Sequence, residues 1–131
     1  MIPEKKILLE KWLLVADHDL EVARYIIEGN PLVLDAACFH CQQAIEKNLR
    51  AFLVFCNYNF PKTHDLSKLK KACLSFDKDF DKIDIKDLED FAVHVRYPGD
   101  SIDPSIEIAE EYIKIVNQTR RLVLKKIALK K

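Results

Sequence analysis

Apolar residues recur every three to four positions through most of the chain, which is the spacing of one side of an α-helix. The pattern is clearest between residues 35 and 55, where it predicts one long helix that begins near Leu32 and ends by residues 57–59. We expect this helix to lie in a helical core, because its apolar side is wide. That side carries Leu34, Cys38, Cys41, Ile45, Leu49, Phe52 and Cys56.

The preceding segment predicts a first helix from about Glu4 to Ile27, which ends before Gly29 and Pro31 because a proline cannot continue a helix. Its expected apolar stripe consists of Leu8, Trp12, Val15, Ala16, Ala23 and Ile26. Asp19 projects into the middle of this stripe, where a carboxylate is costly to bury unless it is paired. We therefore expect a cationic or donor partner for it, in a structural ion pair or in a site. The candidates are His40, Lys47 and Arg96.

Three further helices are predicted after residue 60. Thr63 or Asp65 is a natural N-cap for a short third helix, whose apolar set is Leu66, Leu69, Cys73 and Phe76. A fourth helix is expected from about Ile85 to Val95, and a fifth from Asp103 as N-cap with Pro104 at its first position. The expected fold is a single all-α domain over residues 1–131, an up-and-down antiparallel bundle of about five helices.

The composition agrees with one folded, helix-rich domain, since 49% of the 131 residues are hydrophobic and only two are glycines. Lys plus Arg equals Asp plus Glu, at 21 each, which argues against a protein that coats nucleic acid through net charge but permits a local basic patch. No segment approaches the ~18 consecutive apolar residues of a membrane span, and the first residues lack a signal-peptide pattern. We expect a cytoplasmic protein without a membrane partner.

Cys38 and Cys41 form a C-x-x-C pair with His40 between them, which raises the question of a zinc or redox site. Both sulfurs fall on the apolar side of the second helix, His40 points elsewhere, and no second ligand pair completes a four-ligand set. We therefore expect reduced thiols packed in the core, with metal as a minor alternative. No cofactor is predicted.

The other side of the second helix carries a polar row of His40, Gln43, Lys47 and Arg50, at spacings that place them within about two turns. Such a row can face an anion or a partner. His64 falls at the start of the third helix, where exposed amides favour anions, although a solvated loop residue is the simpler reading. Arg96 and Tyr97 stand before Pro98, at a fixed turn. The predicted ligand-binding set is Asp19, His40, Gln43, Lys47, His64, Arg96 and Tyr97, with no catalytic or metal-binding residue assigned.

Together, Asp17–Leu20, Cys38–Lys47 and Phe60–Leu66, followed by Arg96–Pro98, resemble the minimal HEPN domain, a helical module linked to nucleotide binding. The resemblance covers nearly the whole chain. It implies a helical bundle with a fifth helix. Proteins of this kind are commonly dimeric and are often encoded beside a small nucleotidyltransferase, as in toxin–antitoxin pairs. It also implies that many relatives are metal-independent ribonucleases, whose composite site uses an Arg followed after four to six residues by a His.

The chain departs from that ribonuclease signature. Arg96 matches the Arg, but Ser101, Ile102 and Asp103 stand where the His would fall. Cleavage of RNA needs a group that exchanges a proton near neutral pH, which Arg does poorly. We therefore expect a homodimeric module that binds a nucleotide or RNA, or a nucleotidyltransferase partner, without nuclease activity. Two alternatives stay open: an atypical ribonuclease using Arg96 with His64 or His94, and a structural bundle whose polar row is a subunit interface.

Overall fold

The computed structural model describes residues 1–29, 31–60, 62–85, 87–91 and 103–129. These residues form four α-helices, three short 3-10 helices and no strand, which confirms the predicted all-α fold. The α-helices are α1 (Pro3–Gly29), α2 (Leu34–Phe55), α3 (Leu66–Phe76) and α4 (Ile106–Leu129), and the 3-10 helices are η1 (Pro31–Val33), η2 (Lys78–Lys82) and η3 (Leu88–Phe91). None of the helices in these ranges is both long and apolar enough for a membrane span.

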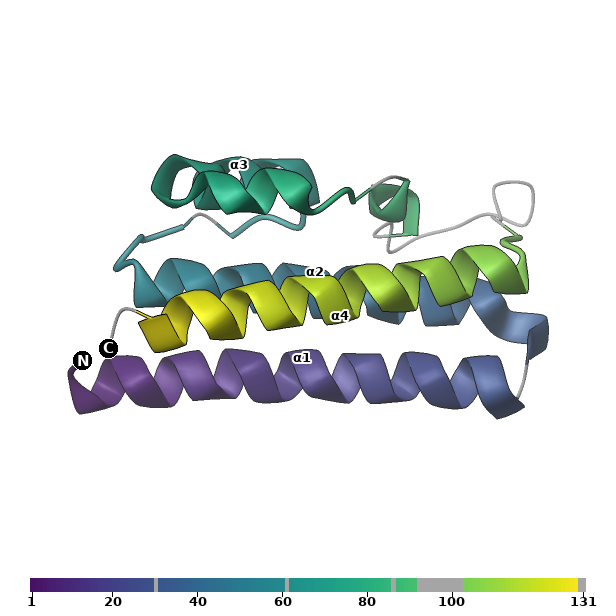
Figure 1. The fold of residues 1–131 in the computed structure, drawn as a ribbon. Helices are drawn as coiled ribbons and strands as arrows, with labels where there is room; N and C mark the ends of the chain where they lie inside the picture. Colours follow the sequence, from purple (N-terminus) through teal and green to yellow (C-terminus); the bar gives the residue numbers. More distant parts are fainter. Residues whose placement is uncertain (30, 61, 86, 92–102, 130–131) are drawn as a thin grey trace.

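The central element is α2. The three long helices α1, α2 and α4 lie side by side, and α3 lies across from α1 on the other side of α2 and α4 (Figure 1). α2 packs against α1, α3, α4 and η3, and each residue from Leu34 to Cys56 is buried or half-buried. α1 runs antiparallel to both α2 and α4, so that the start of α1 and the end of α4 lie at the same end of the bundle (Figure 1). The predicted central role of this helix is confirmed.

Small side chains allow α1 and α2 to lie close together. Alanines recur at seven-residue spacing on each helix, which keeps them on one side, and each is at most 1% exposed. They are Ala16 and Ala23 on α1, and Ala37, Ala44 and Ala51 on α2. On a neighbouring side of α2 the ring of Phe52 packs against Phe80 of η2, with ring centroids 4.4 Å apart. α2 therefore presents small residues to one neighbour and large ones to another.

The segment between α2 and α3 doubles back along α2. Asn57, with a positive φ of 59°, turns the chain, and Tyr58 N–H donates to the carbonyl of Leu53 as the helix ends. α3 then starts at Leu66, capped by the side chain of Asp65 as predicted, and runs in the same direction as α2. Its last residue, Phe76, returns to Tyr58, with ring centroids 5.8 Å apart. The chain between α2 and α3 thus returns along α2 as an extended loop and not as a helix.

The predicted apolar stripe of α1 was only partly correct. Leu8 is 47% exposed, whereas Leu9 and Leu20, which the stripe omitted, are buried at 4% and 6%. The reason is that α1 is apolar on two sides, so periodicity alone does not say which side faces the core. Ile7 and Leu14 belong to the exposed side.

Two predicted helix starts were wrong in detail. Where a helix was expected from about Ile85, the described residues form only the 3-10 helix Leu88–Phe91, and residues 86 and 92–95 lie outside the described part. The last helix begins at Ile106, because the hydroxyl of Ser105 accepts the N–H of Ile108 at 3.2 Å and takes the capping role expected of Asp103.

Lys126 of α4 joins the C-terminal helix to η2. Its ammonium nitrogen lies 2.9 Å from Asp77 Oδ2 and 2.5 Å from Asp79 Oδ2. The hydrogen bond from Lys126 holds the pKa of Asp79 below its usual value. Burial alone would raise the pKa of Asp77, but the N–H of Asp79 and the ammonium of Lys126 lower it overall.

Because both carboxyl pKa values are lower in the folded protein, the two groups stabilise it above the unfolded value of 3.8 and lose that effect as the pH falls further. We expect the free energy of unfolding to decrease as the pH falls below about 4. The Lys126→Met variant should lose less stability over this range than wild type in urea denaturation. Lys114→Met, on an exposed part of α4, is the control and should behave like wild type. Equal acid sensitivity of Lys126→Met and wild type would contradict this assignment.

Candidate ligand-binding site

A column of polar side chains runs along the side of α2 that faces the returning loop. Gln42, Glu46 and Arg50 are four residues apart, so they lie one above another, and they are 0%, 3% and 5% exposed. Glu46 Oε2 accepts from Arg50 Nε at 3.3 Å, and Glu46 Oε1 lies 3.2 Å from His64 Nδ1. The two charges are therefore buried as a pair, with a histidine at the outer end.

This column holds the returning loop in place. Arg50 donates to the carbonyl of Thr63, and Gln42 Nε2 lies 3.4 Å from the carbonyl of His64. The Arg50 guanidinium also lies over the rings of Trp12 and Phe60, 5.6 and 4.8 Å from their centroids. The expectation that Arg50 belongs to an open polar row was wrong, because the aromatic rings and the loop cover it.

A second cluster lies between α1 and α2. Asp19 Oδ1 is 2.8 Å from His40 Nδ1, and Asp19 Oδ2 is 2.5 Å from Lys47 Nζ. The Asp19 side chain is 11% exposed, whereas those of His40 and Lys47 are 29% and 23% exposed. The predicted partnership of Asp19 with His40 and Lys47 is confirmed. Arg96, the third candidate, lies outside the described residues.

Gln43 lies between the two clusters on α2. Its amide nitrogen donates to Gln42 Oε1 at 2.7 Å, and its side chain is half-buried. We call the combined set of Asp19, His40, Gln42, Gln43, Glu46, Lys47, Arg50 and His64 the polar seam. Tyr97, like Arg96, lies outside the described residues. Of the predicted ligand-binding set, the described part of the chain thus brings Asp19, His40, Gln43, Lys47 and His64 into the seam.

Sequence reasoning did not assign Gln42 and Glu46 to this site. A signal was present, since Glu46 and Arg50 have opposite charges at i, i+4 spacing and Gln42 continues the column one turn earlier. The burial of the column could not be read from that spacing, because it depends on a loop that returns along α2.

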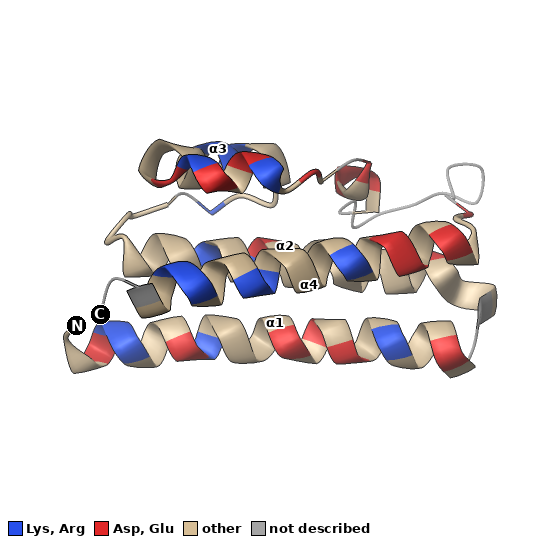
Figure 2. Cartoon of the chain, in the orientation of Figure 1, with Lys and Arg blue, Asp and Glu red and all other residues tan. Residues whose placement is uncertain are grey.

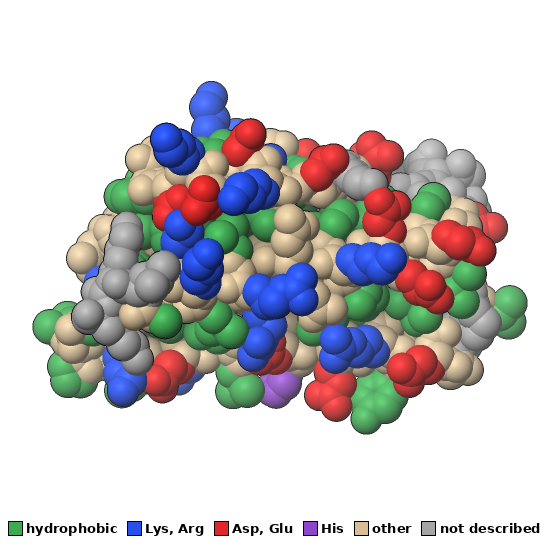
Figure 3. Space-filling view, viewed as in Figure 1, with side chains coloured by type: hydrophobic (Ala, Val, Ile, Leu, Met, Phe, Trp, Pro, Cys, Tyr) green, Lys and Arg blue, Asp and Glu red, His purple; other side chains and the backbone are tan. Residues whose placement is uncertain are grey.

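The charges of the polar seam are balanced. Asp19 and Glu46 offset Lys47 and Arg50, so the seam is neutral when both histidines are neutral. Lys and Arg side chains gather over the C-terminal half of α4, while acidic residues mark its first turns (Figures 2 and 3). The local basic surface seen in this view therefore belongs to α4 and not to the seam.

The described residues contain no group of three or more His, Cys, Asp or Glu side chains placed to hold a metal ion. Cys38 and Cys41 are fully buried, as the prediction of packed core thiols required. Burial raises the pKa of the Cys38 thiol to about 12 and raises that of Cys41 as well. Neither thiol is suited to nucleophilic chemistry at neutral pH.

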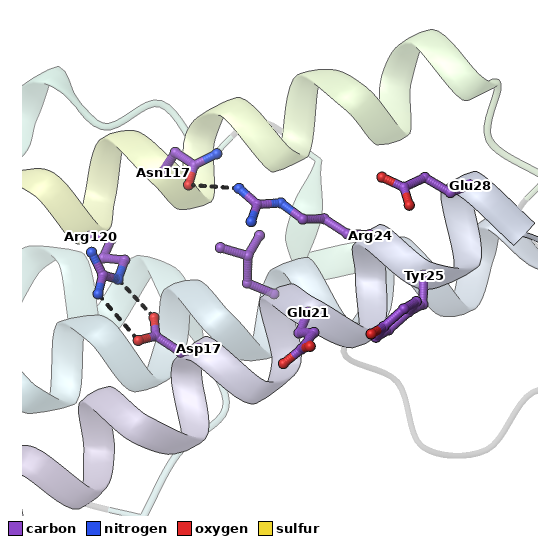
Figure 4. A pocket seen from close by; sticks show the side chains of 8 residues that line it. Asp17, Glu21, Arg24, Tyr25, Glu28, Asn117 and Arg120 are labelled. Atoms are coloured by element: carbon purple, nitrogen blue, oxygen red, sulfur yellow. Dashed lines mark hydrogen bonds and ion pairs between the residues drawn. The ribbon is translucent and has the colours of Figure 1, made fainter.

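A separate groove of about 540 Å³ lies between α1 and α4 (Figure 4). Arg120 of α4 donates to both carboxylate oxygens of Asp17, at 2.8 and 3.2 Å, and Arg24 reaches across to Asn117 at 3.4 Å. The remaining lining residues are Leu20, Glu21, Tyr25 and Glu28. Sequence analysis did not predict this groove, because it depends on which sides of α1 and α4 meet.

The described fold and the polar seam define a class of protein: an all-α bundle whose candidate site is built on its central helix. A family model for the HEPN domain matches residues 9–127, and this chain belongs to the HEPN domain family. The chain is also similar to the crystal structure of an archaeal HEPN homologue, with a TM-score of 0.65 and 25% sequence identity. The match covers 91% of this chain and 97% of that one. No curated protein matches the chain.

The two aspartates of α1 provide a matched test of the buried cluster. Asp19→Asn removes the counter-charge of Lys47 where the carboxylate is 11% exposed, and we expect it to lower the free energy of unfolding by about 1–3 kcal/mol. Asp17→Asn breaks a pair whose side chains are 40% and 39% exposed, and it should cost less than about 1 kcal/mol. Urea denaturation of both variants measures the difference. If the two substitutions cost the same, Asp19 is not a buried anchor.

Proposed function

We propose that this HEPN protein is a homodimeric binding module that recognises a nucleotide at the outer edge of the polar seam. His40, Gln43, Lys47 and His64 contact the ligand in this proposal, and Asp19 positions two of them. The observation that carries it is the Asp19 cluster, in which one carboxylate holds Lys47 and His40 together while both keep part of their surface in solvent. Donors that are already fixed lose less conformational entropy when a ligand binds.

The chemistry of these side chains suits a phosphorylated ligand with an aromatic base. An ammonium group and an imidazole N–H donate strong hydrogen bonds to phosphate oxygens, and the Gln43 amide can donate or accept. His64, whose side chain is 58% exposed, offers a ring on which a base can stack. Arg96 and Tyr97 remain part of the proposed site through the family resemblance. The balanced charge of the seam favours one nucleotide over a long stretch of nucleic acid.

Two other roles are less well supported. Ribonuclease activity would need Arg96 with His64 or His94, and His64 is instead tied to Glu46 in the described seam. A small nucleotidyltransferase partner remains a prediction from the family resemblance, because no described contact favours it. The alternative that the polar seam is a subunit interface is tested by the same experiment as nucleotide binding.

The test is an NMR titration of the wild-type protein with ATP, GTP, UTP, CTP and a short single-stranded RNA, followed by a gel of the RNA. We expect amide shifts centred on residues 40–47 and intact RNA. Lys47→Met should reduce the affinity at least about tenfold, because it removes one charge-assisted hydrogen bond to phosphate.

Lys114→Met is the matched control, since it removes the same charge from an exposed position on α4. Nucleotide affinity that is unchanged in Lys47→Met, or the absence of shifts in wild type with every nucleotide, would contradict the proposed site. A change in the monomer–dimer equilibrium of Lys47→Met without any ligand response would assign the seam to a subunit interface.

A further inference from the structure

The outer side of α1 is apolar although it faces solvent. Ile7, Leu14 and Tyr25 are 53%, 55% and 67% exposed, and their spacings of seven and eleven residues keep them on one side of the helix. That side lies away from the buried row of Leu9, Ala16 and Ala23. A helix that is apolar on two sides is normally covered on both, so this stripe suits an interaction surface.

Charged residues on the same side are arranged unevenly along the helix. Lys11 lies in the N-terminal half of α1 and Glu21 in the C-terminal half, and both are exposed. Neither makes a hydrogen bond or an ion pair with another residue in the described part of the chain. Glu21 and Tyr25 lie at the edge of the groove between α1 and α4 (Figure 4). The surface thus has a cation near one end, an anion near the other, and Leu14 with the exposed His18 between them.

The spacing of these residues selects a partner and an orientation. Lys11 and Glu21 are each five positions from residue 16, and Ile7 and Tyr25 are each nine positions from it. A second copy of α1 placed antiparallel, with a two-fold axis on the outer side of the helix at the level of residue 16, therefore brings Lys11 to Glu21 and Ile7 to Tyr25 at the same time. A parallel copy would instead place each charge against itself.

We infer that a second copy of this chain packs antiparallel along the outer side of α1, with two Lys11–Glu21 ion pairs flanking the two copies of Leu14. Glu4 and Glu28 meet at the far ends of this arrangement, where solvent screens their repulsion. Glu21 and Tyr25 also line the α1–α4 groove, so the partner's Lys11 would sit at the edge of that groove. This inference rests on the homodimer half of the proposed function.

Light scattering across a dilution series tests the surface. We expect wild type to be a dimer and Leu14→Asp to raise the dissociation constant by at least about a hundredfold, because it replaces an apolar side chain beside the two-fold axis with a charged one. Leu14 is 55% exposed, so the subunit should stay folded, which circular dichroism checks. Lys11→Glu and Glu21→Lys should each raise the dissociation constant about tenfold through like-charge contacts.

The charge-swapped double variant Lys11→Glu/Glu21→Lys should recover wild-type dimerisation. Lys6→Glu is the matched control, because it makes the same charge change on the side of α1 that faces α4, and it should leave the dimer unchanged. A dimer that persists in Leu14→Asp would overturn this surface alone, and a double variant no better than the single ones would overturn the antiparallel pairing. A monomeric wild type would overturn both this inference and the proposed homodimer, while the nucleotide titration tests the binding site separately.

Discussion

The buried ion pair between Glu46 and Arg50 is the interaction on which the described architecture depends. The chain leaves α2 at Cys56 and returns as an extended loop, whose carbonyl groups have no helix to pair with. Arg50 and Gln42 supply donors to two of those carbonyls, and Glu46 makes it possible to bury the Arg50 charge. The loop in turn sets the start of α3. The apolar side of α3, with Leu66, Leu69 and Cys73, can then cover α2.

The same helix that anchors the loop also carries the candidate ligand site, and burial separates the two roles. Glu46 and Arg50 have almost no exposed surface, so their charges are paired inside the fold and do not face a ligand. Lys47 and His40 point to another side of α2, where Asp19 of α1 fixes them but leaves them partly open. A rigid central helix is a good base for such donors, because its packing on several sides limits movement of the backbone. The proposed binding site therefore depends on the rigidity of α2, the same helix that carries the buried Glu46–Arg50 pair.

Sequence patterns predicted the elements whose environment is set locally. α2 was predicted well because its apolar side is wide, and the pairing of Asp19 was predicted because a carboxylate in an apolar stripe needs a cation. Predictions from these patterns were wrong where packing between distant parts of the chain determines which side chains are buried. α1 is apolar on two sides, Arg50 is covered by a loop from another part of the chain, and Ser105 caps α4 in place of Asp103. Burial of Asn48 without a hydrogen-bond partner for its amide group also has no explanation in the described residues.

The most direct test of this account is a double-mutant cycle on Glu46→Gln and Arg50→Met, with the free energy of unfolding measured by urea denaturation. If the buried pair anchors the returning loop, each single variant leaves one charge without its partner, and the double variant costs much less than the sum of the two. We predict a coupling energy on the order of 2–3 kcal/mol. Additive effects, with a coupling energy near zero, would show that the loop and α3 are held by other contacts and would contradict the account.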